Sequence, residues 1–189
     1  MLDRGRFFVG VTGAQGVGKS TFCRNLHSQL QDAGRGDVRL LDGLGTSVAA
    51  MGVPLGSGST PQTIIAVWTV HLEREAAAPD GVIVLDRCIV DALAYTRALR
   101  LGSDLERRLF EQVAVLVSGR LAIVLHLRLS PFFLGKGAAH ESPALRSEVA
   151  KEIDAVLREL RPRQLDLNAD SDDAVDRAVR AVLEALDGR

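Results

Sequence analysis

Short apolar runs alternate with stretches of helical periodicity along most of the chain. Most of the runs are rich in valine, isoleucine and leucine, which is typical of strands that are covered on both faces of a sheet. The runs that predict strands span residues 7–11, 38–41, 81–86, 121–127 and 163–168. Between them, apolar residues recur three or four positions apart, as on one face of a helix. This spacing predicts helices over residues 19–33, 62–78, 88–100, 104–117, 142–160 and 171–186.

The order of these elements predicts the class of fold. Strands that alternate with helices indicate parallel pairing through right-handed crossovers. We therefore expect a three-layer α/β fold with a mostly parallel five-stranded sheet, and a single domain over residues 1–189. The glycine- and serine-rich stretch over 43–61 predicts a loop with room for a short helix. In the helix predicted over 104–117, one apolar face is marked by Leu105, Leu109, Val113 and Leu116.

The charge and the cysteines limit the kinds of partner and compartment. Lysine and arginine number 23 and acidic residues 24, so the formal net charge is −1 and the chain has no general attraction to nucleic acid or to an acidic membrane. Cys23 and Cys88 lack metal-binding spacing and are expected to be reduced thiols. Without a predicted signal peptide or membrane span, we expect a cytoplasmic protein.

One stretch between the first predicted strand and the first predicted helix carries the strongest chemical signal. It reads GAQGVGKS and matches the phosphate-binding pattern G-x-x-x-x-G-K-[ST], with a further hydroxyl at Thr21. Glycines let the backbone wrap around a phosphate, and the following helix adds its positive end. Lys19 is expected to reach the β and γ phosphates, and Ser20 to bind Mg²⁺. The residues expected to bind ATP are Gly13, Ala14, Gln15, Gly16, Val17, Gly18, Lys19, Ser20 and Thr21.

A carboxylate closes the strand predicted over 81–86. The carboxyl ends of parallel strands open onto the ligand crevice, so Asp86 is a candidate to support the Mg²⁺ bound by Ser20. The alternative is that Asp86 caps the following helix, and it could do both. Asp42 closes the strand predicted over 38–41, where the alternative is a simple turn because the next residue is glycine.

The segment VIVLDRCIVDALAYTRAL, with its Asp86–Arg87 pair, resembles the nucleoside and nucleoside-monophosphate kinase branch of P-loop proteins. The resemblance implies that Arg87 orients the substrate or the transferred phosphoryl group; a solvated surface arginine is the alternative. Asp91 and Tyr95 follow one and two helical turns later. The resemblance also implies that Asp42 positions or deprotonates the acceptor, with Asp86 as second candidate. The Arg-Glu-Pro cluster of thymidylate kinases is absent after this strand, which argues against thymidylate as the substrate.

The segment over 130–143 resembles a kinase lid, because it follows the fourth predicted strand and contains glycines and Lys136. An ordinary loop is the alternative. Arg146 is the arginine that this resemblance would bring over the phosphates. The loop over 52–62 is expected to border the acceptor pocket, and Trp68 is expected to belong to the core.

These features together predict a kinase that uses ATP and Mg²⁺ to phosphorylate a small acceptor, a nucleoside or a nucleotide. The expected catalytic residues are Lys19, Asp42, Asp86, Arg87 and Arg146, and the expected metal ligands are Ser20 and Asp86. A homodimer is left open. One alternative is an ATPase or switch that works through a protein partner. A GTPase is disfavoured because the DGLG sequence at Asp42 follows Lys19 too closely and the guanine-reading N-K-x-D motif is absent.

Overall fold

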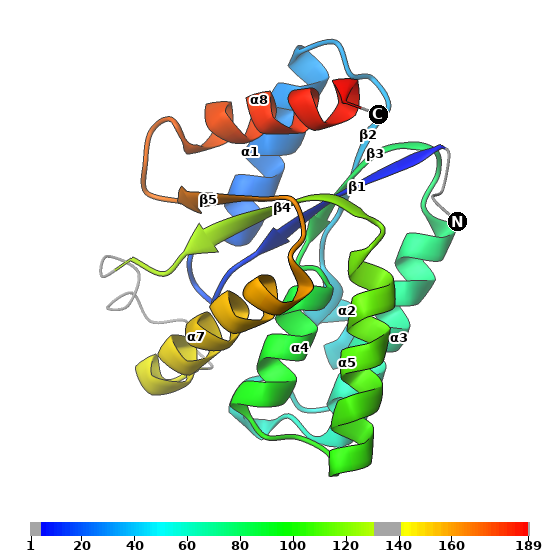
Figure 1. The fold of residues 1–189 in the computed structure, drawn as a ribbon, viewed down its shortest axis with the longest axis vertical. Helices are drawn as coiled ribbons and strands as arrows, with labels where there is room; N and C mark the ends of the chain where they lie inside the picture. The colour runs from blue at the N-terminus through cyan, green and yellow to red at the C-terminus, as the bar shows by residue number, and fades with distance from the viewer. Residues whose placement is uncertain (1–4, 131–140, 189) are drawn as a thin grey trace.

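A parallel sheet lies at the centre of the computed structural model, which describes residues 5–130 and 141–188. Its strands lie in the order β2-β3-β1-β4-β5, and every neighbouring pair is parallel. The expected α/β fold is therefore confirmed, with a sheet that is parallel throughout (Figure 1). The strands are β1 (Arg6–Thr12), β2 (Val38–Leu41), β3 (Gly81–Asp86), β4 (Leu121–Arg128) and β5 (Gln164–Asn168).

Helices cover both faces of this sheet. In Figure 1, α1 and α8 lie on one side of the strands, and α3, α4, α5 and α7 lie on the other. The helices are α1 (Lys19–Asp32), α2 (Leu44–Ala50), α3 (Pro61–Ala77), α4 (Ile89–Ala98), α5 (Asp104–Ser118), α7 (Pro143–Leu160) and α8 (Ala174–Asp187), with a short 3₁₀ helix over Gly56–Gly58. Among the described residues, no helix is both long and apolar enough to cross a membrane.

Two apolar cores follow from this layering, one on each face of the sheet. Successive side chains of a strand point to opposite faces. In β1, Val9 and Val11 therefore pack with α1 and α8, whereas Phe8 packs with α3, α4, α5 and α7. Because both faces are buried, the strand reads as a continuous apolar run rather than as an alternating one.

The face of α5 that meets the core shares only the half-buried Val113 with the apolar face marked in the sequence. Leu105, Leu109 and Leu116 are 71%, 59% and 74% exposed. The buried face instead carries Phe110, Ala114 and Val117. Phe110 stacks on the buried Trp68 of α3, with 5.6 Å between ring centroids, so Trp68 belongs to the core as expected. This contact between two helices, invisible to local periodicity, fixes how α5 is turned.

The stretch predicted as a loop with room for a short helix contains α2. Leu44 and Val48 of this helix are buried against Ala66 and Val70 of α3, and this packing holds a segment whose glycines weaken its intrinsic helix propensity. At the start of α7, the Ser142 hydroxyl accepts a hydrogen bond from the backbone N–H of Leu145 and so caps the helix. The final helix begins at Ala174, a few residues later than predicted.

The parallel arrangement brings the carboxyl ends of all strands to one edge. Thr12, Asp86 and Arg128 end three neighbouring strands there, and the glycine-rich loop after β1 starts at the same edge. Ligands of such sheets bind outside this edge. Residues 131–140, most of the segment that resembles a lid, lie outside the described part of the chain.

Candidate functional site

The loop between β1 and α1 has the backbone geometry of an anion cradle. Gly13 has φ of 155°, and a Cβ added to it would lie 2.6 Å from the Leu127 carbonyl oxygen, so no side chain fits there. Gly18 precedes α1 in a left-handed conformation and provides no side-chain cap. The first N–H groups of α1 are therefore left for an anion, as triphosphate binding requires.

Lys19 lies in the first turn of α1 and is buried. Its Nζ donates to the carbonyl oxygens of Gly13 and, at 2.8 Å, of Ala14. Burial, with the nearby positive charge of Arg87, lowers the pKa of Lys19 to about 8. The ammonium group is thus held inside the loop in a poorly hydrated position, where a phosphate would be a strong partner.

A hydroxyl and a carboxylate meet beside this loop. The Ser20 Oγ donates to Asp86 Oδ2 at 2.6 Å, which joins the start of α1 to the end of β3. Both are hard oxygen ligands, and Mg²⁺ at phosphate sites is commonly held by one or two protein oxygens together with the phosphates. The donor set at Ser20 and Asp86 therefore fits an Mg²⁺ ion that bridges to a nucleotide.

Arg87 has an unusual backbone. Its φ is 77°, a left-handed conformation that is rare for residues other than glycine, and its N–H donates to the Val11 carbonyl at 3.2 Å. The guanidinium lies over the Tyr95 ring, 5.9 Å from its centroid, and its Nη1 is 3.9 Å from Asp91 Oδ1. Strained residues of this kind persist only where the surrounding structure holds them, and they are concentrated at functional sites.

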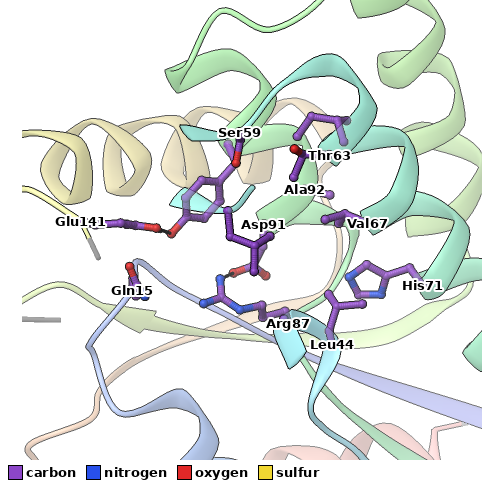
Figure 2. Close-up of a pocket in the computed structure, with 14 residues that line it drawn as sticks. Gln15, Leu44, Ser59, Thr63, Val67, His71, Arg87, Asp91, Ala92 and Glu141 are labelled. Carbon is purple, nitrogen blue, oxygen red and sulfur yellow. Dashed lines mark hydrogen bonds and ion pairs between the residues drawn. The ribbon is translucent and has the colours of Figure 1, made fainter. Parts of the chain in front are cut away.

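A cavity of about 180 Å³ lies next to the loop, and we call it the side cavity. Its apolar wall comes from α2 and α3, and its polar groups come mainly from α3, α4 and Glu141, which precedes α7. It is lined by Gln15, Leu44, Gly45, Leu55, Ser59, Thr63, Ile64, Val67, His71, Arg87, Asp91, Ala92, Tyr95 and Glu141. Figure 2 shows Gln15 and Glu141 on one side, Leu44, Val67 and His71 on the other, and Arg87 with Asp91 between them.

The side cavity and the space around the phosphate loop share two lining residues, Gln15 and Arg87. The remaining lining of the loop space is Gly16, Gly18, Lys19, Ser20 and Thr21. A molecule in the side cavity would therefore lie beside a nucleotide whose phosphates occupied the loop.

Several polar groups of the side cavity are fixed by hydrogen bonds. The Tyr95 hydroxyl donates to the Glu141 carboxylate at 2.9 Å, and the Gln15 amide, with its nitrogen toward Glu141, donates to the same carboxylate at 2.8 Å. Asp91 Oδ2 accepts from the Cys88 N–H at 3.1 Å. Asp91 Oδ1 and His71 Nε2 are buried without a hydrogen-bond partner among the described residues. Burial, with the nearby Arg74 and Arg87, lowers the pKa of His71 to about 4.

The structure brings most of the predicted site residues together, but two of them line neither the side cavity nor the loop space. Asp42 is exposed, its backbone carbonyl accepts from the Arg74 guanidinium, and it lines neither the side cavity nor the loop space. Arg146 is only 1% exposed, and its Nε donates to the Gln15 carbonyl at 2.9 Å. It therefore contacts the backbone of the loop instead of lining the space for phosphates. Catalytic roles for both residues stay predictions.

Two ionisable residues of the side cavity were missed in the sequence. His71 lies on the buried face of α3, one turn after Val67, so a histidine on an apolar helix face was the available signal. For Glu141 the local sequence gave no signal, because Tyr95, the group it meets, lies 46 positions earlier. Leu55 and Ser59 of the loop over 52–62 line the side cavity, and that this cavity is the acceptor pocket stays a prediction.

Comparisons with known proteins agree with the fold. A family model for an AAA domain matches residues 8–174. Comparison with curated protein sequences finds no match. Among solved structures, the fold is similar to two structures of deoxyadenosine kinase from M. mycoides, one with the products dCMP and dCDP and one with bound dATP. Their TM-scores are 0.67 and 0.66, at 14% identity, and each match covers 96% of this chain and 99% of the other.

Proposed function

The chain belongs to the AAA domain family, and from this membership and the geometry of the site we propose that the protein transfers the γ-phosphoryl group of ATP, with Mg²⁺, to a small acceptor, a nucleoside or a nucleotide. The observation that carries this proposal is the side cavity, which adjoins the phosphate loop through Gln15 and Arg87. A protein that only hydrolysed ATP would need no second cavity at this place. The nucleoside-kinase fold of the structural neighbours also supports the proposal.

The residues of the loop would hold the triphosphate. Its N–H groups and the positive end of α1 would bind the phosphate oxygens, and Lys19 would offset the negative charge that develops during transfer. Ser20 and Asp86, whose Oγ and Oδ2 lie 2.6 Å apart, would hold the Mg²⁺ ion, which would supply positive charge to offset the charge of the phosphates. Arg146, through its bond to the Gln15 carbonyl, would hold the loop in shape.

The residues shared with the side cavity would orient the acceptor. Arg87 is held by its backbone, by Asp91 and by the Tyr95 ring, so its guanidinium is already positioned beside the reacting groups. Asp42 stays the predicted base, although its exposed position would require the loop around it to turn toward the acceptor.

The first test measures ADP formation from Mg-ATP in the presence of single nucleosides and nucleotides. We expect at least one acceptor to be phosphorylated and to raise ADP formation. Lys19→Ala should abolish this activity, because the Lys19 ammonium would no longer offset the negative charge that develops on the phosphates during transfer. The variant should still fold. Lys151→Ala, on the exposed part of α7, is the matched control and should behave like the wild type. Equal activity of the Lys19 and Lys151 variants would contradict the proposed site.

A second function, an ATPase that works through a protein partner, is favoured by one observation. The exposed leucines of α5, Leu105, Leu109 and Leu116, form an apolar helix face, and such faces can mark contacts with proteins. An ATPase of this kind would release inorganic phosphate at a rate that no acceptor changes. Transfer to an acceptor would instead yield one phosphorylated product for each ADP.

A further inference from the structure

The described lining of the side cavity carries more negative than positive charge. Its charged groups are Arg87, Asp91 and Glu141, so two carboxylates stand against one guanidinium. His71 adds no positive charge near neutral pH, since burial lowers its pKa to about 4. The rest of the described lining is apolar or carries uncharged polar groups.

The position of these charges matters more than their sum. Glu141 accepts a hydrogen bond from Gln15, and Asp91 lies close to Arg87 (Figure 2). Gln15 and Arg87 are the two residues that the cavity shares with the phosphate loop. The reacting group of an acceptor must come to this same place to meet the γ phosphate. A phosphate group there would face both carboxylates, and like charges at short range in a partly buried site repel strongly.

Arg87 carries a single positive charge, so it offsets only part of the repulsion from the two carboxylates. Its guanidinium is already 3.9 Å from Asp91 Oδ1 and lies over the Tyr95 ring. A hydroxyl, by contrast, fits the same groups without a charge penalty. Asp91 Oδ1 is a buried acceptor without a hydrogen-bond partner among the described residues, and a hydroxyl could donate to it.

We propose that the reacting group of the acceptor is a hydroxyl and not a phosphate, so that the substrate is an alcohol such as a nucleoside and not its monophosphate. This inference rests on the proposed phosphoryl transfer. In the step, the hydroxyl oxygen forms a bond to the γ phosphorus while the bond from that phosphorus to the β–γ bridging oxygen breaks. ADP leaves with the electron pair, and the hydroxyl proton passes to a carboxylate of the site and then to water.

The test is calorimetry on the full chain with Mg²⁺ and a non-hydrolysable ATP analogue. Matched pairs of probes are titrated: deoxyadenosine and dAMP, deoxycytidine and dCMP, ribose and ribose 5-phosphate. We expect at least one alcohol to bind about tenfold more tightly than its phosphate ester, since a single extra close like charge is enough for that difference. A phosphate ester that binds as tightly as its alcohol, or no alcohol that binds, would overturn the inference.

A titration with the ATP analogue alone, without any acceptor, separates the proposed phosphoryl transfer from the proposed hydroxyl acceptor. If the analogue fails to bind, the proposed phosphoryl transfer itself is lost. If it binds and the phosphate esters are preferred, phosphoryl transfer survives and only the hydroxyl inference is wrong.

A charge-neutral variant tests the physical cause. Glu141→Gln keeps a side chain that can accept from Tyr95 but removes one negative charge, so the preference for the alcohol over its phosphate ester should fall about tenfold. Glu148→Gln, the same change on the outer surface of α7, should leave that preference as in the wild type. A preference equal in the two variants would show that the cavity charge does not select the acceptor.

Discussion

At the scale of single residues, burial decides which charges the site presents. His71 illustrates this, because a buried imidazole that adjoins arginines is held neutral at a pH where an exposed one would be partly charged. The sequence showed only a histidine within a helix, and its depth depends on how α2 and α3 pack together. In contrast, the backbone geometry of the loop from Gly13 to Ser20 could be predicted from its glycines, which are local signals, whereas its binding of a nucleotide stays a prediction.

The low pKa of His71 predicts how stability depends on pH. The unfolded chain takes up a proton on this residue near pH 6.5, whereas the folded protein does so only near pH 4. The unfolded state therefore binds more protons between these values, and the free energy of unfolding should fall as the pH falls from 6.5 to 4. The contribution of His71 is about 3 kcal/mol, fully present above pH 6.5.

Urea unfolding at several pH values checks this expectation. His71→Gln should weaken the pH dependence over that range, because the amide does not titrate. His27→Gln replaces a half-buried histidine of α1 outside the cavity and controls for the general effect of the substitution. The expectation is wrong if the His71 variant loses stability with acid as steeply as the wild type.

At the scale of elements, the sequence predicted where helices lie better than how they are turned. The strands and most helix ends follow from apolar runs, caps and glycines, which are local signals. The orientation of α5 does not, because its exposed leucines give a clearer pattern than the buried face with Phe110. Which face is buried was decided by the stacking of Phe110 on Trp68, a contact between distant parts of the chain.

This orientation can be tested with two neighbouring substitutions in α5. Phe110→Ala should lower the free energy of unfolding by about 3–5 kcal/mol, since it removes a buried ring and leaves a cavity beside Trp68. Leu109→Ala, at an exposed position, should change it by less than about 0.5 kcal/mol. Chemical denaturation of both variants measures the difference, and a reversed order would mean that the leucine face is the buried one.

At the scale of the whole molecule, the site is a product of topology. Residues from the loop after β1, the end of β3, α3, α4 and the start of α7 meet at one edge because all strands run in the same direction. The fold class was therefore predictable from element order, and so was the edge at which the phosphate loop and the side cavity lie. The side cavity was only partly predictable, since Glu141 and Tyr95 come together through tertiary packing alone.

Because the nucleotide site belongs to the folded state alone, ligand binding should stabilise the entire domain. Mg-ATP analogue at about 100 times its Kd should raise the free energy of unfolding by about 2.7 kcal/mol. Thermal melts with and without the analogue measure this, and the increase should vanish in Lys19→Ala. A gain of the same size in that variant would indicate that the nucleotide binds elsewhere.

The left-handed backbone at Arg87 has a consequence for the stability of the protein. Glycine would adopt the same conformation with less strain, so stability alone favours glycine at this position. In the proposed transfer, the guanidinium would act between the side cavity and the phosphate loop at the expense of this backbone strain. Position 87 would therefore exchange stability of the fold for the placement of one positive charge.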